Sequence, residues 1–278
     1  MKNLKKPTVD CFDEFEKIRE SKLIKTRDEL KLIKTQVSDR YREYDREFLS
    51  NSLENISNST FVNDDKANLI GCYSKKTKAL NTLILNIREA QVGNICQYCG
   101  IDSDDSIDHY LPKEDFSEFS VKPLNLIPCC LRCNQLKEQY WKNKKTLKRG
   151  IINLYLDDIC LDQYLFMNLK FEPTSKVFSA EFYLENRTSI DTNLFDIISS
   201  HYKKLDLLDR YRKKFNSVYT STLSSFRKNS DYLGKPSKIK GFLLNETEAL
   251  AEDLGSNNYK VVIKKALASN NTFLNQIK

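Results

Sequence analysis

Helix-breaking residues are scarce in this chain of 278 residues, which contains seven glycines and six prolines. Their scarcity favours long helices and argues against a turn-rich fold made only of β-strands. Long apolar runs are missing as well, because stretches such as Leu83–Leu85 are far too short to span a membrane. The first ten residues are charged and do not resemble a signal peptide. We therefore expect a cytoplasmic protein with no membrane partner.

Two stretches before residue 93 have the periodicity of amphipathic helices. Apolar residues recur at helical spacing over residues 11–56 and again over residues 66–92. Gly93 and Asn94 then break the pattern. We therefore predict a helical N-terminal region at residues 1–92.

The pattern changes again after Gly150. A partly alternating stretch interrupted by Pro173 predicts a β-hairpin, and helical spacing returns beyond it. The predicted elements are a hairpin over residues 165–171 and 177–184, a helix over residues 192–230, and one or two helices from Thr247 onward. The sequence thus predicts a mainly helical α+β protein whose C-terminal region, residues 151–278, holds a short hairpin and then helices.

Eight cysteines in a chain expected to be cytoplasmic indicate metal or redox chemistry rather than structural disulfides. Two Cys-x-x-Cys pairs, Cys96 with Cys99 and Cys130 with Cys133, can supply four thiolates to one tetrahedral zinc ion. A redox dithiol is the alternative, but it would need one pair at a helix start in a thioredoxin-like unit. Cys129 offers a competing register that lacks a cysteine three positions on. The unpaired Cys11, Cys72 and Cys160 are expected to be ordinary buried residues.

The segment between the two cysteine pairs contains further polar residues in a distinctive order. Asp108-His109 is followed by Leu111-Pro112, then by Asn125-Leu126, and Asn134 comes directly after the last cysteine. This order resembles the HNH endonuclease family, whose fold is a β-hairpin and a helix around one metal ion. The resemblance covers about fifty residues, and it predicts a small ββα-metal core at residues 93–150 with two zinc knuckles, flanked by helical regions.

The resemblance implies a role for each of these polar residues. His109 would be the general base, and Asn125 would orient it through a hydrogen bond. Asp108 and Asn134 would hold Mg²⁺ or Mn²⁺, while the four cysteines would hold a structural Zn²⁺. Asn134 stands where the family name has a histidine, but active members also carry asparagine there, and its amide oxygen suits a hard cation.

The basic residues that follow the motif are predicted to contact nucleic-acid phosphates. Residues 131–150 contain seven basic residues and one acidic residue. A solvated helix face is the alternative interpretation of such a run. Trp141, within this run, could stack on a nucleotide or anchor the helix end, and we expect the anchor. The predicted phosphate contacts are Arg132, Lys137, Lys142, Lys144, Lys145 and Lys148.

The resemblance predicts a metal-dependent endonuclease that cuts DNA. It further suggests a bacterial anti-phage defence nuclease, paired with a protein partner such as an ATPase or a sensor subunit. A zinc-stabilised nucleic-acid-binding or scaffold protein is the alternative, and it would not need the Asp108-His109 pair. RNA also remains open as a substrate, because nothing in the sequence identifies a reader of the 2′-hydroxyl group.

Overall fold

The computed structural model describes residues 1–91, 93–159, 162–228 and 236–277. The chain divides into two compact units, one made of Asn3–Asp157 and the other of Met1–Lys2 with Asp158–Lys278. Helices dominate both units, and each contains a single two-stranded sheet among its described residues. The predicted α+β class with a helical majority is therefore confirmed. Cys160 lies outside the described residues.

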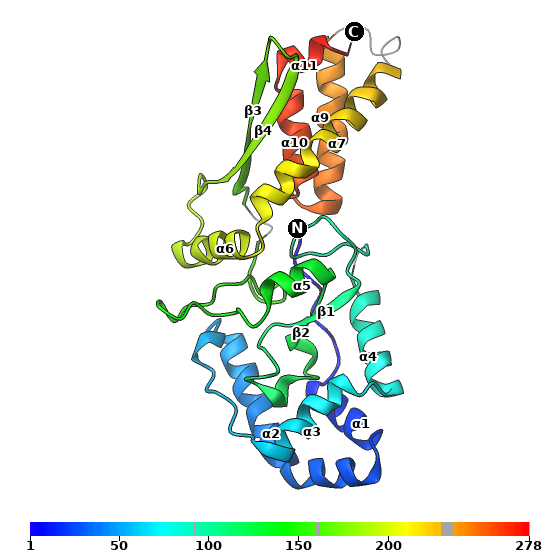
Figure 1. Cartoon of the computed structure of the whole chain (residues 1–278), viewed down its shortest axis with the longest axis vertical. Coiled ribbons are helices and arrows are strands. Elements are labelled where there is room, and N and C mark those ends of the chain that lie inside the picture. The colour runs from blue at the N-terminus through cyan, green and yellow to red at the C-terminus, as the bar shows by residue number, and fades with distance from the viewer. Residues whose placement is uncertain (92, 160–161, 229–235, 278) are drawn as a thin grey trace. The chain divides into compact units, whose positions relative to one another are not determined.

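The unit Asn3–Asp157 places its helices around a short antiparallel hairpin (Figure 1). Its elements are α1 (Cys11–Glu20), α2 (Ile24–Leu49), α3 (Asn63–Ser74), α4 (Lys78–Glu89), β1 (Ser106–His109), β2 (Leu126–Cys129) and α5 (Leu131–Lys137), with 3₁₀ turns at Leu53–Asn55, Ser117–Phe119 and Pro123–Asn125. In the sheet, Ser106 pairs with Cys129 and His109 pairs with Leu126.

Each predicted N-terminal helical stretch is in fact two helices. The side chain of Asp10 accepts hydrogen bonds from the first turn of α1, and Thr77 does the same for α4, as N-cap residues do. Between α1 and α2, the ammonium group of Lys22 binds the backbone oxygens of Gly71, Cys72 and Lys75 at the end of α3. Periodicity alone did not reveal these breaks, because the apolar spacing continues on both sides of them.

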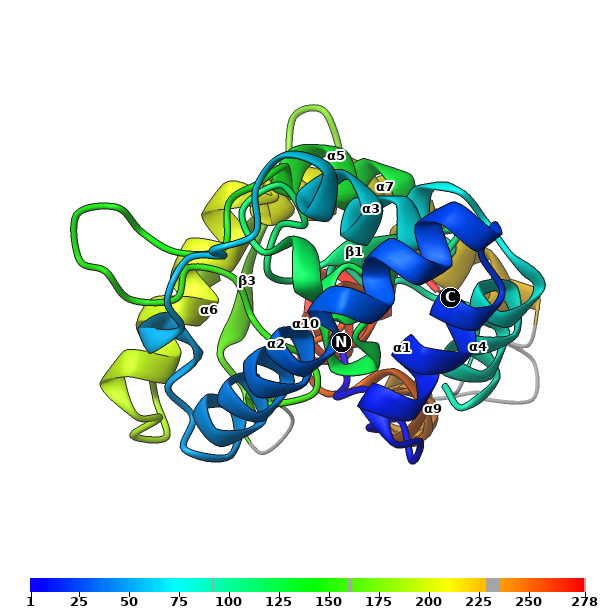
Figure 2. The same cartoon turned by 90° about the horizontal axis from the view of Figure 1, so that it is seen from below.

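The N-terminal helices hold the long connection between β1 and β2. Figure 2 shows α1 and α2 in front of β1, and the ring of Tyr44 on α2 packs against Phe119 with centroids 5.1 Å apart. The hydroxyl group of Tyr44 donates to the backbone oxygen of Leu124. Lys122 is fully buried, and its ammonium group lies 2.7 Å from Asp45 Oδ1 on α2. The connection that carries the predicted site is thus fixed by helices from the first third of the chain.

The first unit continues a few residues beyond position 150. The guanidinium group of Arg149 makes two hydrogen bonds to the carboxylate of Asp157, at 2.8 and 2.7 Å, and both side chains are buried. The hydroxyl group of Tyr155 donates to the backbone oxygen of Leu126 on β2. These buried bonds attach residues 149–157 to the hairpin.

The second unit contains the predicted C-terminal hairpin. Strands β3 and β4 pair from Leu165 opposite Leu184 to Glu172 opposite Val177, which confirms that prediction. The predicted helix 192–230 is divided at Leu205 and Asp206, and its last two residues lie outside the described part of the chain. The elements are β3 (Leu165–Glu172), β4 (Val177–Leu184), α6 (Thr192–Lys204), α7 (Leu207–Lys228), α9 (Pro236–Leu254), α10 (Tyr259–Ala268) and α11 (Asn271–Asn275).

Among the described residues, none of the helices combines the length and the apolar character needed to cross a membrane.

Candidate functional site

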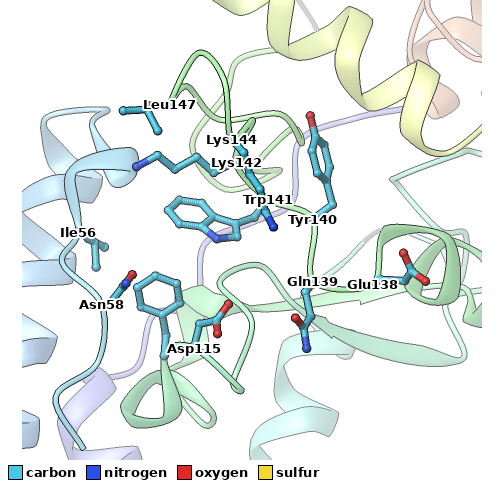
Figure 3. Close-up of a pocket in the computed structure, with 11 residues that line it drawn as sticks. Ile56, Asn58, Asp115, Glu138, Gln139, Tyr140, Trp141, Lys142, Lys144 and Leu147 are labelled. Carbon is cyan, nitrogen blue, oxygen red and sulfur yellow. The ribbon is translucent and has the colours of Figure 1, made fainter.

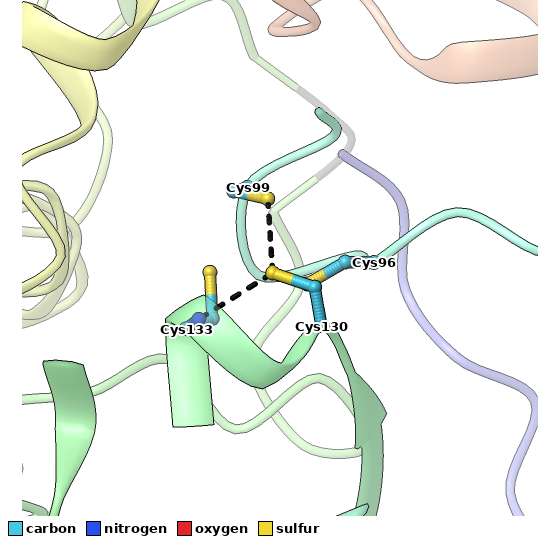
Figure 4. A group of neighbouring side chains, drawn as sticks. All are labelled: Cys96, Cys99, Cys130 and Cys133. Carbon is cyan, nitrogen blue, oxygen red and sulfur yellow. Dashed lines mark hydrogen bonds between the residues drawn. The ribbon is translucent and has the colours of Figure 1, made fainter. Parts of the chain in front are cut away.

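Four cysteine side chains meet in one cluster (Figure 4). The sulfur atoms of Cys96, Cys99, Cys130 and Cys133 all lie within 4.8 Å of one another, and all four residues are buried. A tetrahedron of thiolates around zinc has edges of about 3.8 Å, given a Zn–S distance of ~2.3 Å. The distance between Cys99 Sγ and Cys130 Sγ is 3.9 Å, so the cluster fits such an ion.

Two tight turns bring the cysteine pairs together. In the first turn, the backbone nitrogen of Gly100 donates to the backbone oxygen of Cys96 at 2.7 Å, with a positive φ of 65° that suits glycine. In the second turn, Cys130 caps α5, and the backbone nitrogen of Cys133 points at its sulfur from 3.4 Å. Cys129 stays outside the cluster, which settles the register as Cys130 with Cys133. A cluster of four sulfurs also argues against a lone redox dithiol.

A hollow of about 260 Å³ is lined by three of the four predicted polar residues, without Asn125. Asp108 and His109 reach it from the end of β1, and Asn134 reaches it from α5. The amide nitrogen of Asn134 donates to Ser106 Oγ at 2.7 Å and to the backbone oxygen of Ile107 at 3.2 Å. These bonds attach α5 to β1. They use only the amide nitrogen of Asn134, so its amide oxygen could bind a cation.

The ring of His109 is held by two neighbours. Its Nε2 lies 2.8 Å from the backbone oxygen of Ser120, and the ring of Tyr73 on α3 meets it edge-on with centroids 4.4 Å apart. A carbonyl oxygen only accepts hydrogen bonds, so Nε2 carries the proton and Nδ1 keeps its lone pair. Burial lowers the pKa of His109 to about 4, which keeps the ring neutral. A neutral imidazole of this tautomer can accept a proton at Nδ1.

The carboxylate of Asp108 has partners on both oxygens. Tyr98 donates its hydroxyl group to Oδ2 at 2.9 Å, and the ammonium group of Lys137 lies 3.0 Å from Oδ1. The same ammonium group also binds the backbone oxygen of His109 at 2.9 Å. Lys137 therefore balances the charge of Asp108 and fixes the end of β1.

Comparison with known proteins agrees with this geometry. The family model for the HNH endonuclease matches residues 96–139. Residues 96–139 form an HNH endonuclease domain. Over 197 residues, the chain is 26% identical to "Protein ea31" of Escherichia phage lambda, and the match covers 66% of this chain and 65% of that protein. The chain thus spans about 65% of the length of this curated relative. No solved structure matches the chain.

Within the HNH domain, Asn125 bonds to the connecting loop instead of to His109. Its side chain accepts from the backbone nitrogen of Leu111 at 2.8 Å and donates to the backbone oxygens of Leu111 and Phe119, at 3.0 and 3.1 Å. The predicted hydrogen bond from Asn125 to His109 is therefore replaced by the one from His109 to Ser120. The side chain of Asn125 thus closes the loop that carries the backbone oxygen of Ser120.

The predicted phosphate contacts, which extend beyond the HNH domain, separate into three groups. Lys137 is fully buried against Asp108, so its assignment as a phosphate contact is wrong. Lys142 is half-buried, and its ammonium group donates to the backbone oxygen of Glu54 at 2.7 Å. The side chains that are exposed, as a phosphate contact requires, are Arg132, Lys144, Lys145 and Lys148.

Sequence reasoning missed several residues that hold the site. Tyr73 contacts His109 from the distant helix α3, and Ser120 contacts it from the loop 11 residues further along the chain; no local pattern marks either residue. Lys137 could have been found, because it lies three positions after Asn134 and four after Cys133 on the same helix. Residues at these spacings share one face of a helix, and this face of α5 is turned toward β1.

Proposed function

We propose that this protein is a metal-dependent endonuclease that hydrolyses phosphodiester bonds of DNA. One observation carries the proposal. The imidazole of His109 is held with Nε2 toward the backbone oxygen of Ser120, so that Nδ1 keeps a lone pair in a hollow that also contains Asp108 and Asn134. Hydrolysis of a phosphodiester with one metal ion requires a proton acceptor close to oxygen ligands that hold the metal.

The hollow suits a hard cation such as Mg²⁺ or Mn²⁺. Asp108 and Asn134 offer a carboxylate and an amide oxygen, which are ligands that Mg²⁺ prefers. Each oxygen of Asp108 keeps a second lone pair beyond its bond to Tyr98 or Lys137. Because Lys137 already neutralises the carboxylate, we expect the cation to bind weakly without substrate, whose phosphate adds further oxygen ligands.

In this proposal, His109 acts on the water molecule that attacks phosphorus. The Nδ1 atom accepts a proton from that water as the new bond to phosphorus forms, and the bond to the leaving oxygen breaks. Donation from Nε2 to Ser120 stabilises the positive charge that the ring then carries. A Mg²⁺ ion held by Asp108 and Asn134 would compensate the negative charge on the phosphoryl and leaving oxygens. Asn125 keeps Ser120 in place during this step.

We propose that the cysteine quartet holds a structural zinc ion. A buried site of four sulfurs with tetrahedral spacing selects Zn²⁺ or an iron–sulfur cluster, and the turns around Cys96 and Cys130 are those of zinc knuckles. The quartet joins the turn that precedes β1 to the start of α5, and it thereby helps to set the distance between His109 and Asn134.

The choice of DNA as substrate is supported by the HNH domain, with RNA as the alternative. An association with an ATPase or sensor subunit in anti-phage defence remains a prediction. Copurification of the chain with such a subunit from a native host would test it.

The decisive test is cleavage by purified protein. Plasmid DNA, single-stranded DNA and RNA are incubated with Mg²⁺, Mn²⁺ or EDTA. We expect metal-dependent cutting of DNA that His109→Ala lowers by about 10²–10⁴-fold, the usual loss for a general base. Zinc content and circular dichroism should remain unchanged in this variant.

Two further variants separate the base from its surroundings. His109→Asn keeps a donor toward Ser120 but removes the base, so it should be as inactive as His109→Ala. Asn134→Ala should regain part of its activity at high Mg²⁺ or with Mn²⁺, because it weakens the hold on the cation. Cleavage by His109→Asn at the wild-type rate would refute the assignment of His109 as the base. A wild-type protein that binds DNA without cutting any substrate would favour the alternative of a zinc-stabilised nucleic-acid-binding protein.

A further inference from the structure

A second and larger cavity adjoins the catalytic hollow in the same unit of the protein. Its volume is about 830 Å³, which lies within the range of about 300–1,000 Å³ typical of small-molecule sites. Its walls come from three segments, namely residues 56–58, residues 115–116 and the stretch 138–147 that follows α5 (Figure 3). The HNH chemistry described above uses no residue that belongs to this cavity alone.

The cavity and the catalytic hollow share a boundary. Glu138 lines both of them. The turn after Pro112 also lines both the cavity and the hollow. It is closed by a hydrogen bond of 2.9 Å from the backbone nitrogen of Phe116 to the backbone oxygen of Pro112. Its first half, through Glu114, lines the hollow, whereas Asp115 and Phe116 line the cavity. A nucleotide strand with one phosphate in the hollow therefore brings an adjoining nucleoside to the cavity.

One wall of the cavity is apolar. The indole ring of Trp141 meets Phe116 at 85° with centroids 5.5 Å apart, and Trp141 is only 8% exposed. Ile56 extends this wall, and Leu147, which is 61% exposed, stands at its rim with a positive φ of 57°. The packing of Trp141 against Phe116 makes this wall part of a preformed surface for a flat apolar ligand.

The facing side chains are polar and have free hydrogen-bonding groups. Within the part of the chain that the structure describes, the side chains of Asn58, Asp115 and Gln139 have no hydrogen-bond partner, and all three are exposed. The two amides offer donors and acceptors together, while the carboxylate only accepts. Lys144 adds an exposed positive charge. A nucleobase has a flat apolar face and an edge of hydrogen-bond donors and acceptors. The phosphate of the same nucleotide has the charge opposite to that of the lysine.

We propose that this cavity binds an unpaired nucleobase of DNA, next to the phosphodiester bond in the catalytic hollow. The placement of the phosphodiester bond in the hollow rests on the proposed function, whereas the binding of a base in the cavity does not. A base seated against Trp141, with its edge toward Asp115 and Gln139, cannot keep its partner in a duplex. The substrate is therefore single-stranded at this nucleotide, or the base is extruded from the double helix.

The single tryptophan of the chain makes a direct test possible. Because Trp141 lines the cavity, its fluorescence reports occupation without any cleavage, and the titration is done in EDTA. We expect a short single-stranded DNA to quench the emission, and an abasic strand of equal length and charge to leave it unchanged. A paired duplex should quench only when it carries a bulged nucleotide, which distinguishes an extruded base from a free one.

Variants at the exposed polar residues complete the test. Asp115→Ala combined with Gln139→Ala should weaken the affinity in the quenching titration by about tenfold, as expected for the loss of two hydrogen bonds. Gln135→Ala, an exposed glutamine of α5 outside both cavities, is the matched control and should leave the affinity unchanged. Equal quenching by the abasic strand, no quenching by any DNA, or an unaltered titration in the double variant would overturn the base site. Cleavage of plasmid by the same preparation reports separately on the nuclease function.

Discussion

The cysteine quartet and the hollow around His109, both built from the HNH domain, are stabilised in different ways. The quartet gathers four buried sulfurs, and an ion from outside is needed to compensate four thiolates. The hollow is balanced by the protein itself, because Lys137 pairs with Asp108 and the backbone oxygen of Ser120 satisfies His109. We conclude that the quartet should depend on metal for its fold, whereas the framework of the hollow should stand without one.

Removal of a metal ligand tests the first half of this comparison and should have the largest effect. Cys130→Ser should lose the bound zinc and unfold the HNH domain, because structural zinc contributes about 10–16 kcal/mol to folding in small zinc-finger peptides. Metal analysis and thermal unfolding measure both consequences. Cys129→Ala removes the adjacent buried thiol, which is outside the quartet, and should keep the zinc. Freshly purified wild-type protein without zinc would contradict the assignment.

The two sites also differ in how far the sequence could predict them. The quartet follows from local spacing, and the Asp108-His109 pair and Asn134 are recognisable by their order between and after the cysteines. The contacts of Tyr73 and Ser120 with His109 depend on how α3 and the long loop fold onto the hairpin. Such long-range packing has no local periodicity that a sequence could reveal.

The basic run illustrates a different limit. A count of charges cannot tell which lysines face solvent, and Lys137 lies on the buried face of α5 while Lys144 and Lys145 lie on an exposed loop. The helical predictions failed in a similar way at the breaks after Glu20 and Ser74. Ser21 caps the end of α1, whereas the end of α3 is bound by the distant Lys22 and followed by the Thr77 cap of α4. The α+β class and the C-terminal hairpin were predicted correctly.

Removal of the positive charge from the hollow tests the second half of the comparison. Lys137→Met leaves the buried carboxylate of Asp108 without a compensating positive charge, which should lower the free energy of unfolding by about 3–5 kcal/mol. Chemical denaturation measures this loss. Mg²⁺ should then raise the melting temperature of the variant more than that of the wild type, because the cation takes over the compensation of Asp108.

The exposed Lys145 provides the control for this experiment. Lys145→Met should change the free energy of unfolding by no more than about 0.5 kcal/mol. Equal stability of Lys137→Met and Lys145→Met would mean that Asp108 does not need the ammonium group, and the hollow would then lack the internal charge balance that distinguishes it from the quartet.

The smallest effect on stability is expected from the exposed lysines, which belong to neither site. Charge reversal to glutamate at Lys144, Lys145 and Lys148 should leave zinc content and unfolding unchanged, since all three side chains are exposed. It should weaken DNA binding on all sequences alike, because bonds to phosphate carry no sequence information. The slope of log affinity against log salt should fall by roughly 0.9 for each phosphate that the protein no longer neutralises. Reversal at Lys25, Lys31 and Lys76, which are exposed as well, changes the net charge by the same amount. If both triple variants bind DNA with the same affinity and slope, the net charge of the protein governs binding, and the loop after α5 does not contact the phosphates.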